Sequence, residues 1–219
     1  MIRGLIFDMD GLLFDSERVV QRTWAQAGEM LGLPDMGSHI YNTLGMNYIS
    51  RTEYFQKAVR LDFPMEEFSK ITRKLFYEIT EREGLPVKPG VRELMEYGRE
   101  HGYRMGVATS SGREYAVKFL TEAGLWEYFS GAVFGDMVVK TKPDPTIYLM
   151  ACEQVGVKPE EAMALEDSPN GIRSAYAAGM VPVVVPDLVT PTEEIRKLCY
   201  RECRTLLEIP ALLEELNAG

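Results

Sequence analysis

Two aspartates stand two residues apart near the N-terminus, directly after a short apolar run. The run Ile2–Phe7 ends at Asp8-Met9-Asp10-Gly11, and an apolar run that stops at an acid and a glycine is typical of a buried strand followed by a loop. An irregular turn there can bring both carboxylates to one site, where they could share a cation. An Asp-x-Asp pair alone is more often a solvated acidic turn, so this chemistry needs support from residues elsewhere.

Three further segments carry chemically useful side chains after apolar runs. Thr109 and Ser110 precede a helical pattern, and their hydroxyl and backbone N–H groups could hold the oxygens of an anion. Lys142 stands in a loop that the following proline should stiffen. Glu166 and Asp167 are adjacent acids before a turn that opens the next helix. Taken singly, these features are a helix N-cap, a solvated charge and an ordinary acidic turn.

The elements that must position these residues alternate between short apolar runs and segments with helical spacing. This alternation predicts a parallel α/β sheet. In such sheets ligands bind outside the carboxyl ends of the strands, so the four segments should meet there. The expected strands after the first run are Tyr103–Ala108, Ala132–Phe134, Ala162–Leu165 and Val181–Val185.

One long interval, from about Ser16 to Gly84, shows helical patterns and no convincing strand. We expect a separate helical subdomain over 16–84 and an α/β core formed by 1–15 and 85–219. The apolar stripes of this interval are read as core packing, because aromatic residues at helical spacing need no ligand to explain them. The stripes are Trp24, Ala27, Met30 and Leu31, and Phe68, Ile71, Leu75 and Ile79.

The composition is that of an ordinary globular protein. In 219 residues, 46% are hydrophobic and 26% charged, which favours a packed core over disorder. The net charge of −9 argues against a nucleic-acid partner, since phosphate backbones are bound by clustered Lys and Arg. No run approaches the roughly 20 apolar residues of a membrane span. We expect a cytoplasmic protein with no membrane partner.

Three cysteines, an odd number without dense spacing, argue against a disulfide framework. Cys199 and Cys203 could share a helix face, but the chain has only His39 and His101 as histidine partners for zinc. We expect reduced, structural thiols.

Taken together, the four segments resemble the four ordered motifs of the haloacid dehalogenase-like hydrolase superfamily, in its branch of β-phosphoglucomutase-like phosphatases. The matching stretches are DMDGLLFDS, GVATSS, TKPDP and LEDSPNGI. The resemblance spans essentially the whole chain. It implies an α/β fold with a Rossmann-like parallel-sheet core and an α-helical cap inserted after the first strand, in agreement with the strand-free interval.

The resemblance also implies a reaction, the hydrolysis of small phosphorylated metabolites, sugar phosphates foremost, through an aspartyl-phosphate. Asp8 would be the nucleophile, and Asp10 the general acid and base. Lys142 would balance the charge of the transferred phosphoryl group. Thr109 and the amide of Ser110 would hold its oxygens.

A metal ion is expected because of charge. At an effective dielectric of about 20, a carboxylate about 4 Å from a phosphate dianion is opposed by roughly 8 kcal/mol. Mg²⁺ suits hard oxygen ligands and is commonly held by one or two carboxylates plus phosphate oxygens and waters. Asp8, Glu166 and Asp167 can supply carboxylates, and the resemblance adds the backbone carbonyl of Asp10.

A sugar-phosphate mutase is the main alternative, because it would share all four core motifs. β-Phosphoglucomutases carry a histidine shortly after the first motif, where this chain has Val20. Their cap also has an arginine shortly after a glycine matched by Gly45, and this chain has no arginine there before Arg51. Asn47 and Arg51 are therefore only candidate substrate contacts.

Two further alternatives lie outside phosphate-ester chemistry. A haloalkanoate dehalogenase would need neither the Asp10 acid nor the acidic metal pair. A phosphate-accepting receiver or silent binding protein would not need Asp10, Lys142 and a cap. The physiological metabolite stays open, and relatives with this size of cap often work as monomers.

Overall fold

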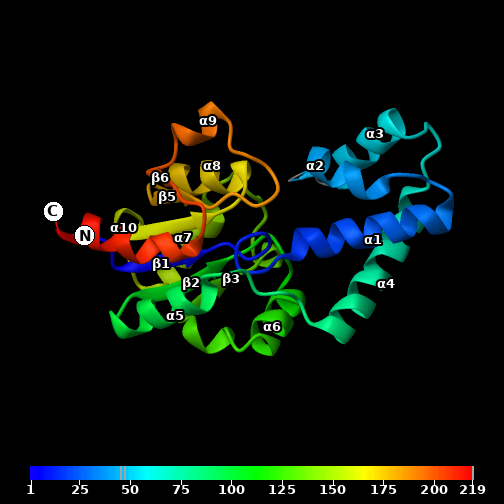
Figure 1. The fold of residues 1–219 in the computed structure, drawn as a ribbon. Coiled ribbons are helices and arrows are strands. Elements are labelled where there is room, and N and C mark those ends of the chain that lie inside the picture. The colour runs from blue at the N-terminus through cyan, green and yellow to red at the C-terminus, as the bar shows by residue number, and fades with distance from the viewer. Residues whose placement is uncertain (45, 47, 219) are drawn as a thin grey trace. The chain divides into compact units, whose positions relative to one another are not determined.

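The computed structural model describes residues 1–44, 46 and 48–218 (Figure 1). The chain divides into two compact units, which we call the core unit (Met1–Phe14 with Val87–Gly219) and the helical unit (Asp15–Pro86). The sequence led us to expect a helical insert over 16–84. Each unit is described by itself.

A six-stranded sheet forms the centre of the core unit, and every neighbouring pair of strands is parallel. The strand order is β3-β2-β1-β4-β5-β6, so β1 lies between β2 and β4. The expected α/β fold with a Rossmann-like parallel sheet is confirmed. The strands are β1 (Gly4–Phe7), β2 (Arg104–Ala108), β3 (Gly131–Val133), β4 (Ala162–Glu166), β5 (Val181–Val184) and β6 (Arg201–Glu202).

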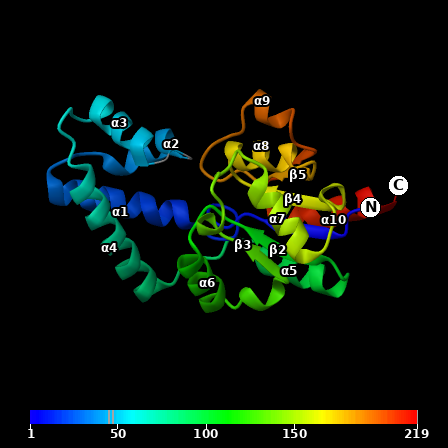
Figure 2. The same ribbon diagram turned by 180° about the vertical axis from the view of Figure 1, so that it is seen from behind.

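The central strands are apolar because both of their faces are covered. All four residues of β1 and all five of β4 are buried, which is why they read as continuous apolar runs rather than alternating ones. Helices lie on both sides of the sheet (Figures 1 and 2). They are α5 (Val91–Glu100), α6 (Arg113–Glu122), α7 (Thr146–Val155), α8 (Pro169–Ala177), α9 (Glu193–Arg196) and α10 (Ile209–Ala218).

Strand β6 was not predicted. It has two residues, both exposed, and pairs with β5 through Val183↔Arg201 and Val184↔Glu202. A strand this short, with charged residues on both faces, leaves no alternation to detect.

The helical unit packs around an aromatic cluster of Trp24, Phe55, Phe63 and Phe68. The Phe55 and Phe63 rings stack at 4.6 Å, and Trp24 meets Phe55 edge-on at 5.3 Å. No strand occurs among the residues described in this unit. Its helices are α1 (Ser16–Leu31), α2 (Ile40–Thr43), α3 (Tyr48–Ala58) and α4 (Met65–Glu83), with a 3₁₀ turn at Met36–His39.

Of the predicted core stripes, one residue is exposed, and three, Leu31, Ile71 and Leu75, are only partly buried. Met30 is 67% exposed, whereas Trp24 and Ala27 are buried. At about 100° per residue, Met30 lies roughly 120° around the helix from Trp24, which places it on the flank of the buried face.

The cysteines and the helices were also compared with the expectations of reduced thiols and no membrane span. All three cysteines are free, and burial raises the pKa of each thiol to about 11, so they are poorly reactive at neutral pH. Within the described part of the chain, no helix combines the length and the apolar character needed to cross a bilayer.

Candidate active site

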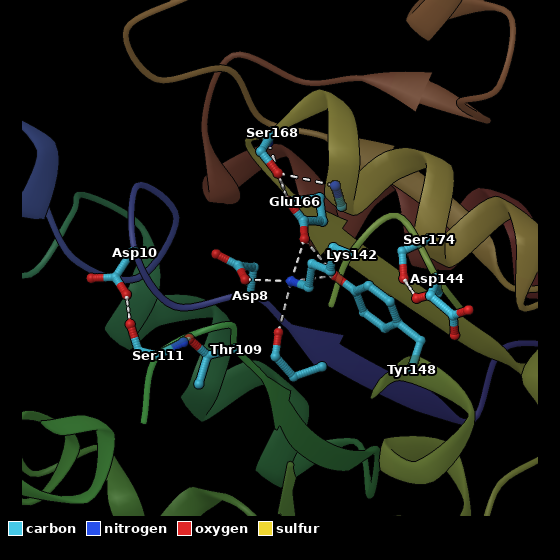
Figure 3. Close-up of polar contacts among 12 residues, drawn as sticks. Asp8, Asp10, Thr109, Ser111, Lys142, Asp144, Tyr148, Glu166, Ser168 and Ser174 are labelled. Carbon is cyan, nitrogen blue, oxygen red and sulfur yellow. Dashed lines mark hydrogen bonds and ion pairs between the residues drawn. The ribbon is translucent and has the colours of Figure 1, made fainter. Parts of the chain in front are cut away.

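Residues from four segments meet at the carboxyl edge of the sheet (Figure 3). Asp8 and Asp10 follow β1, Thr109 follows β2, and Glu166 is the last residue of β4. Because β2, β1 and β4 are neighbours and parallel, their ends lie side by side. Lys142 comes from the long loop between β3 and α7. The predicted meeting of these segments therefore has a direct cause in the strand order.

Lys142 is the centre of this group. Its Nζ donates hydrogen bonds to Asp8 Oδ1 at 2.5 Å, Glu166 Oε1 at 2.6 Å and the Ala108 carbonyl at 2.9 Å. The side chain is 5% exposed. An ammonium buried this deeply is costly unless it is paired and hydrogen-bonded, and two carboxylates meet that need. The peptide between Lys142 and Pro143 is cis.

Burial controls the protonation of this cluster. It raises the pKa of Asp8 to about 7, although the charge of Lys142 acts in the opposite direction. Burial alone would lower the pKa of Lys142, but the carboxylates of Asp8 and Glu166 raise it above its usual value. Burial therefore favours the neutral acid of Asp8 more than it would for an exposed aspartate. Additional positive charge beside Asp8 would favour the carboxylate.

Glu166 is fully buried and held at both oxygens. Oε1 accepts from Lys142 and from the Tyr148 hydroxyl at 2.7 Å, while Oε2 accepts from the Ser168 backbone N–H at 3.1 Å and its hydroxyl at 3.0 Å. Burial, followed by the charge of Glu166, raises the pKa of Tyr148 well above its usual value, so its hydroxyl stays a donor. Tyr148 and Ser168 were not predicted as site residues.

Gly171, in the first turn of α8, leaves room for this carboxylate. A Cβ at this position would lie 1.7 Å from Glu166 Oε1. We expect Gly171→Ala to lower stability by about 1–3 kcal/mol or more, as overpacking does, and to disturb Lys142 through Glu166. Thermal unfolding and kcat measure the two effects. Asn170→Ala, one residue earlier in the same helix, is the control, and equal behaviour of the two variants would contradict this account.

Asp10 is oriented by two hydroxyl groups. Ser111 donates to Oδ2 at 2.6 Å, and Tyr115, in α6, donates to Oδ1 at 3.0 Å. Asp10 is partly exposed, unlike Asp8. Ser111 stood inside the second motif and could have been proposed, but nothing in the sequence connects Tyr115 with Asp10. The two neighbouring aspartates thus occupy different environments.

The carboxylates of Asp8, Glu166 and Asp167 form the group that could hold a metal ion. One oxygen from each lies within 4.8 Å of the others. The donor set is all oxygen, which suits Mg²⁺. Asp8 Oδ1 is bonded to Lys142, whereas Oδ2 accepts no hydrogen bond from the described residues and points away from the lysine (Figure 3). These residues therefore fit a hard divalent cation.

Thr109 and Ser110 differ in their burial and in the polar groups they leave available for a ligand. Thr109 is buried, and its Oγ1 accepts the Ser111 backbone N–H at 3.0 Å, so its hydroxyl hydrogen can be donated elsewhere. Ser110 is exposed at the edge of the sheet. Both lie in the turn before α6, as the sequence predicted.

Two residues of the helical unit, Asn47 and Arg51, were candidate substrate contacts. Asn47 lies outside the described residues. Arg51 donates to the Met46 carbonyl at 3.0 Å, and its guanidinium lies 5.5 Å from the centre of the Trp24 ring. Burial lowers the pKa of Arg51. Arg51 is thus held by contacts within its own unit, and its role as a substrate contact stays a prediction.

The helical unit also has a cavity of about 500 Å³ along one face of α4. Three cations on α4, Lys70, Arg73 and Lys74, line it together with Tyr48 from the start of α3. One acid, Glu66, also lines the cavity, so its charged lining is mixed with an excess of cations. No pattern in the sequence pointed to these cations.

Comparisons with known proteins agree with this geometry. Residues 5–185 match the family model described as haloacid dehalogenase-like hydrolase. The chain belongs to this family. The resemblance noted in the sequence is thereby confirmed, and the chain is an enzyme of the hydrolase class.

Curated relatives match this hydrolase over most of their own length. A Bacillus subtilis protein, YhcW, is 33% identical and covers 100% of this chain and 99% of its own. The phosphorylated carbohydrates phosphatase of Thermotoga maritima is 31% identical, with 82% of each chain covered. Among solved structures, CbbY from Rhodobacter sphaeroides in complex with phosphate superposes with a TM-score of 0.76 at 28% identity, covering 95% of this chain and 96% of that one.

Proposed function

We propose that this hydrolase removes phosphate from small phosphorylated metabolites, sugar phosphates first among them, and that Asp8 carries the phosphoryl group as a transient aspartyl-phosphate. The chain is a phosphoric monoester hydrolase. The observation that carries the proposal is the state of Asp8, a buried carboxylate held by Lys142 at one oxygen and open at the other. The phosphatases among the relatives support this reading.

The first displacement would use the open oxygen of Asp8. Oδ2 attacks phosphorus, the P–O bond to the metabolite breaks, and the leaving oxygen takes a proton from Asp10. Ser111 and Tyr115 hold Asp10 at separate oxygens, which fixes the direction of that carboxyl group. In the second displacement Asp10 takes a proton from water, which attacks the phosphorus and releases Asp8 and inorganic phosphate.

Charge balance would come from Lys142 and a bound cation. Lys142 is already fixed by Asp8 and Glu166, so it needs no reorganisation when phosphoryl charge arrives. Asp8, Glu166, Asp167 and the Asp10 carbonyl would hold Mg²⁺, which when bound neutralises phosphate charge and favours the ionised form of Asp8. The Thr109 hydroxyl and Ser110 amide would donate to phosphoryl oxygens.

Transfer to water is favoured over return to a sugar. The position where mutases have a histidine is Val20, a half-buried residue of α1 that cannot move a proton. Incubation with β-glucose 1-phosphate separates the two activities, because a phosphatase releases inorganic phosphate whereas a mutase accumulates glucose 6-phosphate. We further propose that the helical unit acts as a cap that selects the substrate.

Removal of divalent metal should abolish activity. We expect release of para-nitrophenol from para-nitrophenyl phosphate to stop with EDTA and to return with Mg²⁺, because the Asp8 carboxylate cannot approach a phosphate dianion unaided. Full activity in EDTA would contradict the metal part of the proposal. Absence of repeated turnover at any Mg²⁺ concentration, with the fold intact, would contradict the phosphatase itself and favour a silent binding protein.

A further inference from the structure

Lys88 belongs to none of the four motifs, yet it reaches the loop that carries Asp8 and Asp10. It lies where the chain re-enters the core unit. Its Nζ donates to the Gly11 carbonyl at 2.8 Å and to Asp187 Oδ1, in the loop after β5, at 2.8 Å. The Lys88 side chain is 17% exposed and that of Asp187 is 4% exposed. Three distant segments of the core unit are thus joined by one ammonium group.

Gly11 is held on both of its backbone polar groups. Its N–H, which shares a peptide with the Asp10 carbonyl, donates to the Phe14 carbonyl at 3.0 Å, and its own carbonyl, which belongs to the next peptide, accepts from Lys88. The Asp10–Gly11 peptide is trans, and in a trans peptide the C=O points away from the N–H, so the Asp10 carbonyl is directed away from Phe14. The Lys88 backbone N–H also donates to the Leu13 carbonyl at 2.9 Å. Lys88 therefore holds the turn with both its main chain and its side chain.

Gly11 is in addition packed against a metal-site residue. Its φ is +83°, and a Cβ there would lie 2.2 Å from Asp167 Oδ2. Lys88 on one side and Asp167 on the other therefore leave Gly11 little freedom. A shift of Gly11 would move the Asp10 carbonyl and the space beside the Asp167 carboxylate together.

Stability alone does not account for a lysine at this position. A buried ion pair is often no more stabilising than well-packed apolar residues of similar volume. The Lys88–Asp187 pair makes one contact that apolar residues could not make, the hydrogen bond to the Gly11 carbonyl. That contact lies one residue from Asp10.

We propose that Lys88 is a positioning residue of the active site, which orients the Asp10 carbonyl by holding Gly11 and is itself held by Asp187. The inference rests on the proposed function, because it takes the Asp10 carbonyl as a metal ligand. Residues that do not touch the metal but hold its ligands in place by hydrogen bonds typically matter for metal binding. Their removal weakens metal affinity by about 10–100-fold.

The test is Mg²⁺ binding to the substrate-free enzyme, measured by isothermal titration calorimetry. Lys88→Met removes the ammonium and keeps an apolar stem, and we expect it to weaken Mg²⁺ binding by about 10-fold. The KM for para-nitrophenyl phosphate at saturating Mg²⁺ should stay within about twofold, since no phosphate contact is lost. Asp187→Asn should weaken Mg²⁺ binding in the same direction by a smaller factor. Arg201→Met, which removes a cation from the exposed pair with Glu215, is the control and should bind Mg²⁺ as the wild type does.

Wild-type Mg²⁺ affinity in a folded Lys88→Met variant would overturn the inference. If Lys88→Met does not fold, Asp187→Asn decides by the same titration, and unchanged affinity there overturns it as well. A failure of the proposed function looks different, because the wild type itself would then bind no Mg²⁺ or release no phosphate. A loss of affinity in Arg201→Met equal to that in Lys88→Met would also overturn the inference, since the effect would not be specific to Gly11.

Discussion

Asp8→Asn should lower kcat for para-nitrophenyl phosphate by roughly 10⁴-fold or more, as expected when a nucleophile is removed. The amide cannot form the aspartyl-phosphate, because its oxygen is a poor nucleophile. The fold should survive, since Asn has nearly the same shape and Lys142 keeps its ion pair with Glu166 at 2.6 Å. Circular dichroism and thermal unfolding would check the fold beside the kinetic assay.

The matched control is Asp62→Asn, the same chemical change at an exposed residue of the helical unit. It should leave kcat within about twofold. If Asp8→Asn kept a kcat within tenfold of wild type, a covalent intermediate on Asp8 would be ruled out, and direct attack by water would have to be considered instead.

Asp10→Asn should lower kcat by roughly 10²–10⁴-fold through loss of proton transfer. Because the backbone carbonyl survives the substitution, Mg²⁺ affinity should stay close to that of the wild type. Asp167→Asn should instead weaken Mg²⁺ binding strongly, since it removes a carboxylate from the metal group. Calorimetric titration of the two variants separates these roles, and equal losses of Mg²⁺ affinity would contradict the division.

The leaving group sharpens the test of Asp10. A sugar alkoxide must be protonated as it departs, whereas para-nitrophenolate leaves readily without a proton. The loss in the first displacement caused by Asp10→Asn should therefore be larger for a sugar phosphate than for para-nitrophenyl phosphate. Equal losses in single-turnover rates for both substrates would argue that Asp10 is not the general acid.

The sequence predicted the central sheet and the positions of the four motifs well, for a physical reason. Buried parallel strands need continuous apolar runs, and residues directly after such runs must lie at one edge of the sheet. Strand β6 was not predicted, because two exposed residues show no hydrophobic periodicity. Met30 was misplaced because a stripe of apolar residues extends beyond the face that the helix actually buries.

The polar partners of the motif residues could not be predicted in the same way. Tyr148 lies on the buried face of α7, where a tyrosine is indistinguishable by spacing from any other core residue. Tyr115 and Lys88 are far in the sequence from Asp10 and Gly11, and only the folded chain brings each of them to its partner. Residues that choose the metabolite follow no spacing rule, so Asn47 and Arg51 could only be guessed.

The most direct test of the central claim is to trap the phosphorylated enzyme. Asp10→Asn protein, in which attack by water should be slow, would be mixed with Mg²⁺ and para-nitrophenyl phosphate, quenched, and reduced with sodium borohydride. An aspartyl-phosphate is converted to homoserine by this treatment, and peptide mass spectrometry locates the change. The account predicts homoserine at position 8, absent when Asp8 is also replaced by Asn. Homoserine at another residue, or no modification while phosphate is released, would contradict it.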